Sequence, residues 1–394
     1  MRRGTASLLA LTQLTWRLRS FLTSHSRIVL ADARRSVRRE IFVKIAQVAP
    51  LYESVPPRLY GGTERVVSYL TEALVELGED VTLFATADSK TAARLFPVVE
   101  TGLRLTEGLV DRMAPHILLM ERVCERAADF DVIHFHIDYL HFNLSRRLGL
   151  CSVTTLHGRL DIPELAPLYR EFHDLPLVSI SDAQRAPLPW PDWRATVYHG
   201  IPLDLYRPTD APGQYLAFIG RISPEKRLDI AIEIARRAAL PLKVAAKIDD
   251  VDRRYFDQTI QPLLADSRVE FLGELGDADK QQLLGNALAL VFPIDWPEPF
   301  GLVMIEAMAC GTPVIAFPCG SVREVVDEGV TGFVVANVEE AARAVAKARN
   351  LDRARCRRQF ERRFSARRMA EDYLEVYRQL STRGNLDAAE LVCR

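Results

Sequence analysis

Two carboxylates, Glu298 and Glu306, flank Gly301 in the segment Asp-Trp-Pro-Glu-Pro-Phe-Gly-Leu-Val-Met-Ile-Glu, residues 295–306. If a helix begins here, the free backbone N–H groups of its first residues face an anion, and a phosphate suits such a site. Carboxylates repel a bare phosphate, so the expected partners of the two glutamates are hydroxyl groups. A ligand with phosphates in the middle and hydroxyl-bearing rings at both ends fits this arrangement, and a nucleotide sugar is such a ligand.

The elements around this segment place it at the end of a buried strand. The apolar run over residues 287–293 predicts that strand, and residues 307–309 continue a helix. Pro299 suits the entry to the helix because its missing N–H would have no partner there, and Gly301 lets a ligand approach the backbone closely. In an open α/β sheet, ligands bind at such a turn, beyond the carboxyl end of a strand.

A basic loop is expected beside this anion site. Gly220, Arg221 and Lys226 follow a predicted strand over residues 215–219, and an apolar helical stripe comes after them. Both cations therefore lie between a strand end and a helix start, although an ordinary basic surface loop is the alternative. Arg can grip two phosphate oxygens, whereas Lys supplies a compact charge.

The first half of the chain begins a parallel sheet. A strand over residues 42–49 precedes the loop Gly61-Gly62-Thr63, and a helix with Thr63 as its expected N-cap leads to a strand over residues 81–85. Strand, helix and strand in succession form a βαβ unit. The glycine loop is a weak phosphate signal because Gly-x-Gly-x-x-Gly is absent, and a tight turn is the alternative.

Three histidines stand at predicted strand ends. His134 and His136 point to the same side of a strand within residues 131–138, and His157 ends another strand over residues 153–159. Two histidines at i and i+2 would permit a metal pair, and a hydrogen-bonded core histidine is the other alternative. Both His134 and His136 lie at the carboxyl end of their strand, where the loop turns into the cleft.

Taken together, these segments resemble the retaining GT-B glycosyltransferases of group 1, family 4. The resemblance rests on Glu298-x7-Glu306 with Pro-Phe-Gly after the first glutamate, on Glu-Ala-Met-Ala-Cys-Gly-Thr-Pro-Val-Ile-Ala from the second, and on Gly-Arg…Glu-Lys over residues 220–226. It covers about residues 42–380, and the motifs of the second half are the more specific. It implies an α/β fold of the GT-B kind, with two doubly wound Rossmann-like domains facing across a cleft.

The resemblance also implies a reaction. A hexosyl group would pass from a nucleoside diphosphate sugar to an acceptor hydroxyl of a glycan, lipid or small molecule, with retained anomeric configuration and with neither metal nor cofactor. The leaving diphosphate develops charge as the glycosidic bond breaks, and without a metal this charge must be met by cations and amides. Arg221 and Lys226 are assigned to that task.

The remaining roles are carried over residue by residue. Glu298 is assigned to the sugar, Glu306 to the ribose, and His136 to positioning at the reacting centre, so that the predicted catalytic residues are Arg221, Lys226, His136 and Glu298. The predicted donor-binding residues are Gly62, Gly220, Glu298, Phe300, Gly301, Leu302 and Glu306. Asp138 and His157 are predicted on the acceptor side.

Composition sets the outer bounds. A chain of 394 residues suits two domains, and a net charge of -1 argues against nucleic acid as the main partner. Six scattered cysteines suggest neither a disulfide framework nor a zinc site, which indicates a cytoplasmic protein. Asp-x-Asp patterns at 250–252 and 277–279 are attributed to a turn and a helix start rather than to a metal.

Four segments are expected along the chain. Residues 1–40 form an Arg-rich leader, for which an upstream start codon is favoured over a transit peptide or a membrane-surface helix, so peripheral membrane contact stays open. Residues 41–208 are the acceptor-side domain and 209–365 the donor domain, with a Pro/Gly-containing linker over 207–213. Residues 366–394 form a helix that crosses back to the first domain, and a tail.

Two other functions remain open at this point. A GT-B-like sugar-nucleotide epimerase would share the architecture, and a non-catalytic nucleotide-sugar binding protein would keep Glu306 without turnover. An NAD-dependent oxidoreductase is disfavoured because the glycine fingerprint is missing. The sequence does not identify the base, the hexose, the acceptor or the oligomeric state.

Overall fold

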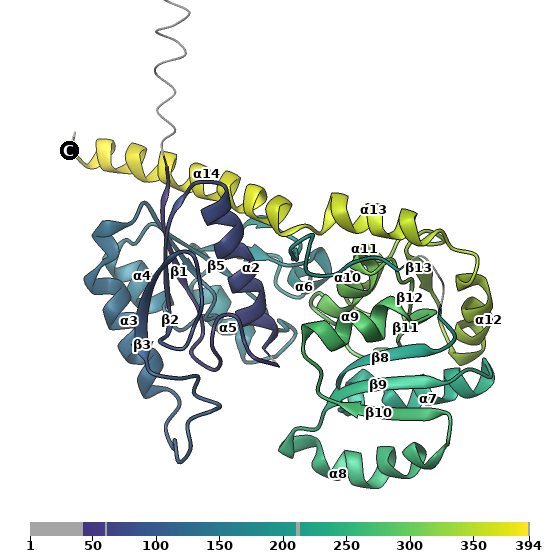
Figure 1. Cartoon of the computed structure of the whole chain (residues 1–394). Helices are drawn as coiled ribbons and strands as arrows, with labels where there is room; N and C mark the ends of the chain where they lie inside the picture. Colours follow the sequence, from purple (N-terminus) through teal and green to yellow (C-terminus); the bar gives the residue numbers. More distant parts are fainter. Residues whose placement is uncertain (1–41, 60, 210–212, 393–394) are drawn as a thin grey trace, which may run out of the picture. The chain divides into compact units, whose positions relative to one another are not determined.

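The computed structural model describes residues 42–59, 61–209 and 213–392. The predicted leader over residues 1–40, residues 210–212 of the predicted linker and the last two residues of the predicted tail lie outside the described residues. The described part contains two parallel β-sheets with helices between their strands (Figure 1), which confirms the predicted α/β fold of two doubly wound units.

The first sheet has seven strands in the order β3-β2-β1-β4-β5-β6-β7. The strands are β1 (Lys44–Val48), β2 (Asp80–Thr86), β3 (Arg94–Val99), β4 (Val132–Phe135), β5 (Ser152–Thr155), β6 (Pro176–Ser179) and β7 (Asp192–Thr196). The connecting helices are α2 (Gly62–Glu76), α3 (Ala114–Glu125), α4 (Phe142–Leu148), α5 (Leu165–Glu171) and α6 (Asp182–Arg185). The strand order reverses between β1 and β4, which pair in parallel with Gln47 opposite His134.

The second sheet has six strands in the order β10-β9-β8-β11-β12-β13. The strands are β8 (Leu216–Arg221), β9 (Leu242–Lys247), β10 (Val269–Gly273), β11 (Ala289–Phe292), β12 (Val314–Ala316) and β13 (Gly332–Val334). The principal helices are α7 (Leu228–Arg237), α9 (Asp277–Gly285), α10 (Leu302–Ala309), α11 (Val322–Val325) and α12 (Val338–Ala348), and short helical turns including α8 (Arg253–Tyr255) cover residues 250–265. Its order reverses between β8 and β11.

Two helices end the described chain, α13 (Arg353–Arg363) and α14 (Ala366–Val392). Helix α14 runs beside α2 (Figure 1). Tyr373 and Tyr377 of α14 are fully buried and hydrogen-bond to side chains of the first sheet, with Thr155 Oγ1 lying 2.8 Å from Tyr373 Oη. The C-terminal helix is therefore part of the packing on that sheet.

The cores explain the sequence pattern. Leu288, Ala289, Leu290 and Val291 are fully buried in succession, because a parallel strand is covered by helices on both faces and needs no polar side. Strands β3, β7 and β13 were not predicted. Strand β13 has only three residues, β7 is half buried and reads Asp-Trp-Arg-Ala-Thr, and β3 is an edge strand with Pro97 inside its apolar run.

The predicted cap of α2 is wrong. Gly61 is the N-cap residue, with φ 149°, and no side chain caps the helix. A Cβ atom at Gly61 would lie 2.8 Å from the Cβ of Pro57, so a threonine could not take this place. Among the described residues, no helix has the length and apolar character needed to cross a membrane.

Candidate active site

The predicted site residues converge. One cavity of about 980 Å³ is lined by every residue that the sequence singled out for the site, from both sheets. These are Gly62, His136, Asp138, His157, Gly220, Arg221, Lys226, Glu298, Phe300, Gly301, Leu302 and Glu306. The cavity lies where parallel-sheet proteins bind ligands, because β4, β8 and β11 each run their carboxyl ends toward it at a reversal of strand order.

The loop that carries Glu298 is clamped from two directions. Ser181, at the end of β6, donates its hydroxyl to the carbonyl oxygen of Pro299 at 2.6 Å. Ser321 donates its backbone N–H to the carbonyl of Glu298 at 3.0 Å and its hydroxyl to the carbonyl of Phe300 at 2.8 Å. The loop is thereby fixed before any ligand enters, so its carboxylate is pre-positioned.

Glu298 presents one oxygen to the cavity. Its Oε2 accepts hydrogen bonds from Lys226 Nζ and, at 2.9 Å, from Trp296 Nε1. Its Oε1 has no hydrogen bond to the described part of the chain. Lys226 and Glu298 were predicted to serve different parts of the ligand, and the structure instead pairs them with each other.

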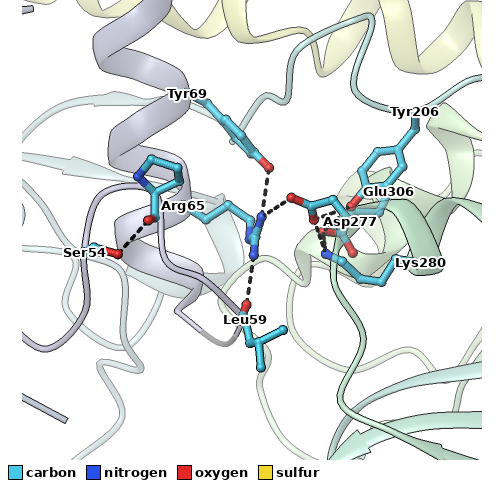
Figure 2. Close-up of polar contacts among 9 residues, drawn as sticks. Ser54, Leu59, Arg65, Tyr69, Tyr206, Asp277, Lys280 and Glu306 are labelled. Carbon is cyan, nitrogen blue, oxygen red and sulfur yellow. Dashed lines mark hydrogen bonds and ion pairs between the residues drawn. The ribbon is translucent and has the colours of Figure 1, made fainter. Parts of the chain in front are cut away.

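Glu306 repeats the same pattern (Figure 2). Its Oε1 lies 2.9 Å from Lys280 Nζ and 3.4 Å from the hydroxyl of Tyr206, while Oε2 has no hydrogen bond within the described residues. The side chains of Lys280 and Glu306 are only 10% and 6% exposed. Each glutamate is therefore oriented through one oxygen by a lysine and an aromatic donor, and the other oxygen remains to accept a hydrogen bond.

The Glu306 carboxylate also belongs to a balanced charge cluster, shown in Figure 2. Lys280 Nζ lies 3.1 Å from Asp277, and Asp277 in turn pairs with Arg65 of α2 at 2.7 Å. Burial alone would raise the pKa of Asp277, but Lys280 and Arg65 hold it below its ordinary value. Arg65 is fixed at the carbonyl of Leu59 at 2.8 Å. The cluster thus connects Glu306 to the loop before α2.

Arg221 lies among carboxylates. Its guanidinium contacts Glu225 at 2.5 Å and Asp252 at 3.2 Å. Asp252 comes from the Asp-x-Asp sequence that had been attributed to a turn, and the turn is confirmed as a short 3₁₀ helix over Asp250–Asp252. These acids orient Arg221 and partly neutralise it, so a bound phosphate would have to share the guanidinium with them.

The glycines of the site divide into two kinds. Gly301 has φ 80° and is the N-cap of α10, so the backbone itself requires glycine. Gly62 and Gly220 have no such φ, and a Cβ atom at either would meet its nearest neighbour at 3.8 Å, an ordinary contact. The protein's own packing therefore does not explain glycine at these two positions.

His136 is buried, His157 is half-buried, and both rings are neutral. His136 is 3% exposed, and burial together with the rings of His134, His157 and His199 lowers its pKa well below the usual value. Burial lowers the pKa of His157 to about 3. His136 Nδ1 lies 2.9 Å from His157 Nε2, so these two predicted site residues contact each other directly.

Two carboxyl groups stand on the same side of the cavity as the histidines. Asp138 is exposed to solvent, and desolvation by the surrounding walls still raises its pKa to about 6. Glu64, in the first turn of α2, is 4% exposed, and burial raises its pKa to about 7. Glu64 was not among the predicted site residues. Within the described residues, no three His, Cys, Asp or Glu side chains come together as a metal site.

Several neighbours of the site were missed from the sequence. They are Gln47, Arg65, Asp252, Tyr206, Lys280 and Glu324. Asp277 and Lys280 at i and i+3 were a readable signal, because such residues neighbour each other on a helix. Glu324 accepts hydrogen bonds at 2.8 Å from the backbone N–H groups of Asp182 and Ala183 at the start of α6, although it was assigned no role. Nothing in the local sequence marks that contact.

Known families match both halves of the chain. A model described as glycosyl transferases group 1 matches residues 208–363, and one described as glycosyltransferase family 4 matches residues 60–198. A D-inositol 3-phosphate glycosyltransferase of Frankia alni is 28% identical in an alignment 349 residues long, which covers 71% of this chain and 83% of that protein. The enzyme of the same description from Mycobacterium bovis is 34% identical over 162 residues, 36% of this chain and 33% of the relative.

A solved structure agrees with the predicted architecture. AviGT4, a glycosyltransferase involved in avilamycin A biosynthesis, superposes with a TM-score of 0.67 at 26% identity, covering 86% of this chain and 98% of the other.

Proposed function

From the premise that this chain belongs to the glycosyltransferases of group 1, family 4, we propose that it transfers a hexosyl group from a nucleoside diphosphate sugar to an acceptor hydroxyl, with retained configuration and without a metal ion. The observation that carries the proposal is the paired arrangement of Glu298 and Glu306. Each has one oxygen held by a lysine and an aromatic donor and one oxygen without a protein partner in the described chain. Two such acceptors suit the hydroxyls of two rings.

The donor would lie across the second sheet's strand ends. Its ribose hydroxyls would donate to Oε2 of Glu306, and its hexose hydroxyls to Oε1 of Glu298. The diphosphate would lie between them, against the first N–H groups of α10, which have no partner within the helix. Gly62 and Gly220 have room for this ligand at the backbone.

Leaving-group stabilisation falls to Lys226 and Arg221. The bond between the anomeric carbon and the diphosphate oxygen breaks, a bond to the acceptor oxygen forms, and the acceptor proton passes to the leaving phosphate. Lys226 is 19% exposed and lies 5.2 Å from the Trp296 ring centroid, so its charge acts in partly dehydrated surroundings. A shift of Lys226 from Glu298 toward the phosphate would follow the developing charge.

The acceptor would enter on the side of the first sheet. Here the cavity wall contains His157, Asp138 and Glu64, besides Arg104 and Tyr139. The histidine, the two carboxyl groups and the tyrosine hydroxyl can accept hydrogen bonds from hydroxyls, whereas Arg104 can only donate. The neutral histidine has no charge to repel an oxocarbenium-like sugar. This lining therefore suits an acceptor that bears hydroxyl groups.

The proposal is tested by measuring release of nucleoside diphosphate from the glucose and mannose conjugates of UDP, GDP and ADP, in the presence of EDTA and of a panel of hydroxyl-bearing glycan, lipid and small-molecule acceptors. We expect release from one donor with an anomeric NMR signal of retained configuration in the product. A changed sugar nucleotide without release would identify an epimerase, and binding without any turnover would identify a binding protein. In the same assay Lys226→Ala tests the role of Lys226. Its matched control is Lys243→Ala, which removes a half-exposed ion pair with Glu270 outside the cavity.

A further inference from the structure

A chain of buried hydrogen bonds leads from helix α14 to the cavity wall. Gln47 Nε2 donates to the hydroxyl of Tyr377 at 3.0 Å, and Gln47 Oε1 lies 2.8 Å from His136 Nε2. His136 Nδ1 then lies 2.9 Å from His157 Nε2. Gln47 is fully buried and does not line the cavity, whereas His157 does. Any effect of Gln47 on a ligand must therefore pass through the two rings.

The donor and acceptor groups of Gln47, His136 and His157 set the direction of these hydrogen bonds. The oxygen of the Gln47 amide can only accept, so the proton of the neutral His136 ring lies on Nε2. His136 Nδ1 is then an acceptor, and the proton between the rings comes from His157 Nε2. His157 Nδ1 consequently has no proton, and it is a buried atom without a partner in the described part of the chain.

The opposite direction can be compared directly. A rotated Gln47 amide would donate to His136 Nε2, the proton of His136 would move to Nδ1, and His157 would hold its own proton on Nδ1. That proton would belong to a buried N–H without an acceptor. Orphaned buried N–H donors are rarer in proteins than under-satisfied acceptors. The observed lack of a partner at His157 Nδ1 therefore favours the first direction.

We infer that Gln47 is a positioning residue: its amide fixes the ring tautomer of His136 and, through it, leaves His157 Nδ1 as an unprotonated acceptor at the cavity wall. Both ring nitrogens of His136 are used inside the protein, so the contact that the sequence assigned to His136 passes to His157. His157 Nδ1 is itself buried, so it accepts from a substrate hydroxyl only if its ring shifts toward the cavity. This last step rests on the proposed glycosyl transfer, while the tautomers do not.

The same network fixes a third ring. Tyr377 accepts from Gln47 and so donates to His134 Nδ1 at 2.7 Å, and His134 Nε2 donates to Thr155 at 2.7 Å. His134 therefore also carries its proton on Nε2. If a carboxylate replaces the Gln47 amide, the hydroxyl of Tyr377 must donate to it, so this hydroxyl accepts from His134 Nδ1 and the proton of His134 lies on that nitrogen. The carboxylate still accepts from His136 Nε2, so the tautomers of His136 and His157 stay the same.

The test is the position of the ring protons, read by two-bond ¹H–¹⁵N correlation spectra of the full chain labelled with ¹⁵N-histidine. His134→Gln, His136→Gln and His157→Gln each remove one ring and assign its signals. We expect wild-type His134, His136 and His157 to be protonated on Nε2. At His157 the tautomer protonated on Nε2 should exceed the one protonated on Nδ1 by about tenfold or more, because the latter leaves one buried donor unsatisfied. A proton on Nδ1 of His157 would overturn the inference without any variant.

Two substitutions of Gln47 supply the matched comparison. Gln47→Glu should keep the wild-type tautomers of His136 and His157 and reverse that of His134. Gln47→Met, of similar volume without donor or acceptor, should leave His136 and His157 as mixtures. Unchanged single tautomers in Gln47→Met would refute the positioning role. Because these spectra need no substrate, absence of turnover would count against the proposed function alone.

Discussion

Replacement of Lys280 by methionine should lower the free energy of unfolding, because the buried carboxylate of Glu306 would lose its ion-pair partner. Removing one partner of a buried ion pair costs about 3–5 kcal/mol, because the remaining charge is left uncompensated. Glu306, only 6% exposed in its side chain, would keep the Tyr206 hydroxyl at 3.4 Å as its hydrogen-bond partner in the described chain. Asp277 would still pair with Arg65 at 2.7 Å. We therefore expect a loss of about 3 kcal/mol in the free energy of unfolding, at the lower end of that range.

The assay is urea unfolding at pH 7, followed by circular dichroism, for four proteins. Glu306→Gln combined with Lys280→Met should regain about 2 kcal/mol relative to Lys280→Met, because no buried charge is then unpaired. Arg122→Met is the control, since its pair with Glu125 is about half exposed and should be worth less than about 0.5 kcal/mol. A Lys280→Met protein as stable as wild type, or a double variant no better than the single one, would refute this reasoning.

Three further predictions concern the site. Lys226→Ala should lower turnover about 100-fold or more while shifting the melting temperature little, and a normal rate would remove Lys226 from the mechanism. Gly320→Ala should destabilise the protein by more than Gly108→Ala. Both glycines have positive φ, but only at Gly320 would a Cβ atom lie 2.2 Å from the Glu298 carbonyl oxygen. Equal losses of stability in thermal unfolding would contradict this prediction. Because burial raises the pKa of Glu64 to about 7, wild type should lose about 3 kcal/mol relative to Glu64→Gln as pH rises from 4.5 through 7, and parallel stability profiles would disprove it.

The parts of the site that were predicted are those with a local sequence pattern. Glu298, Gly301 and Glu306 belong to one strand-to-helix turn, and Arg221 and Lys226 to another. In each case the strand, the turn and the helix are neighbours in sequence, so apolar runs and glycine positions were enough to place the side chains at one sheet edge. The doubly wound fold followed from the same alternation of strand and helix.

The partners of these residues were not predictable in the same way. Lys280 lies 26 residues from Glu306, and Gln47 lies 330 residues from Tyr377. No pattern within one element specifies such pairs, because they arise only when separate elements pack. Asp277 illustrates the limit: it does begin helix α9, as predicted, but its carboxylate pairs with Arg65 and Lys280 instead of capping the helix.

His136 shows a different limit. Its position at a strand end indicated the cavity correctly, but its hydrogen bonds could not be read from the sequence. Both of its ring nitrogens face protein atoms, at 2.8 and 2.9 Å. The structure brings His136 to the cavity wall but leaves it no ring nitrogen for a ligand.

The most direct measurement is calorimetric titration of the wild type and of Glu306→Ala with UDP, GDP, ADP and their glucose and mannose conjugates. Selective binding of one nucleotide is expected, with a loss of about 1.5–3 kcal/mol in Glu306→Ala, the usual worth of hydrogen bonds to a charged group. Such a result would support the ribose contact and identify the base. If no nucleotide binds wild type, or if Glu306→Ala binds as tightly, the donor site described here is contradicted.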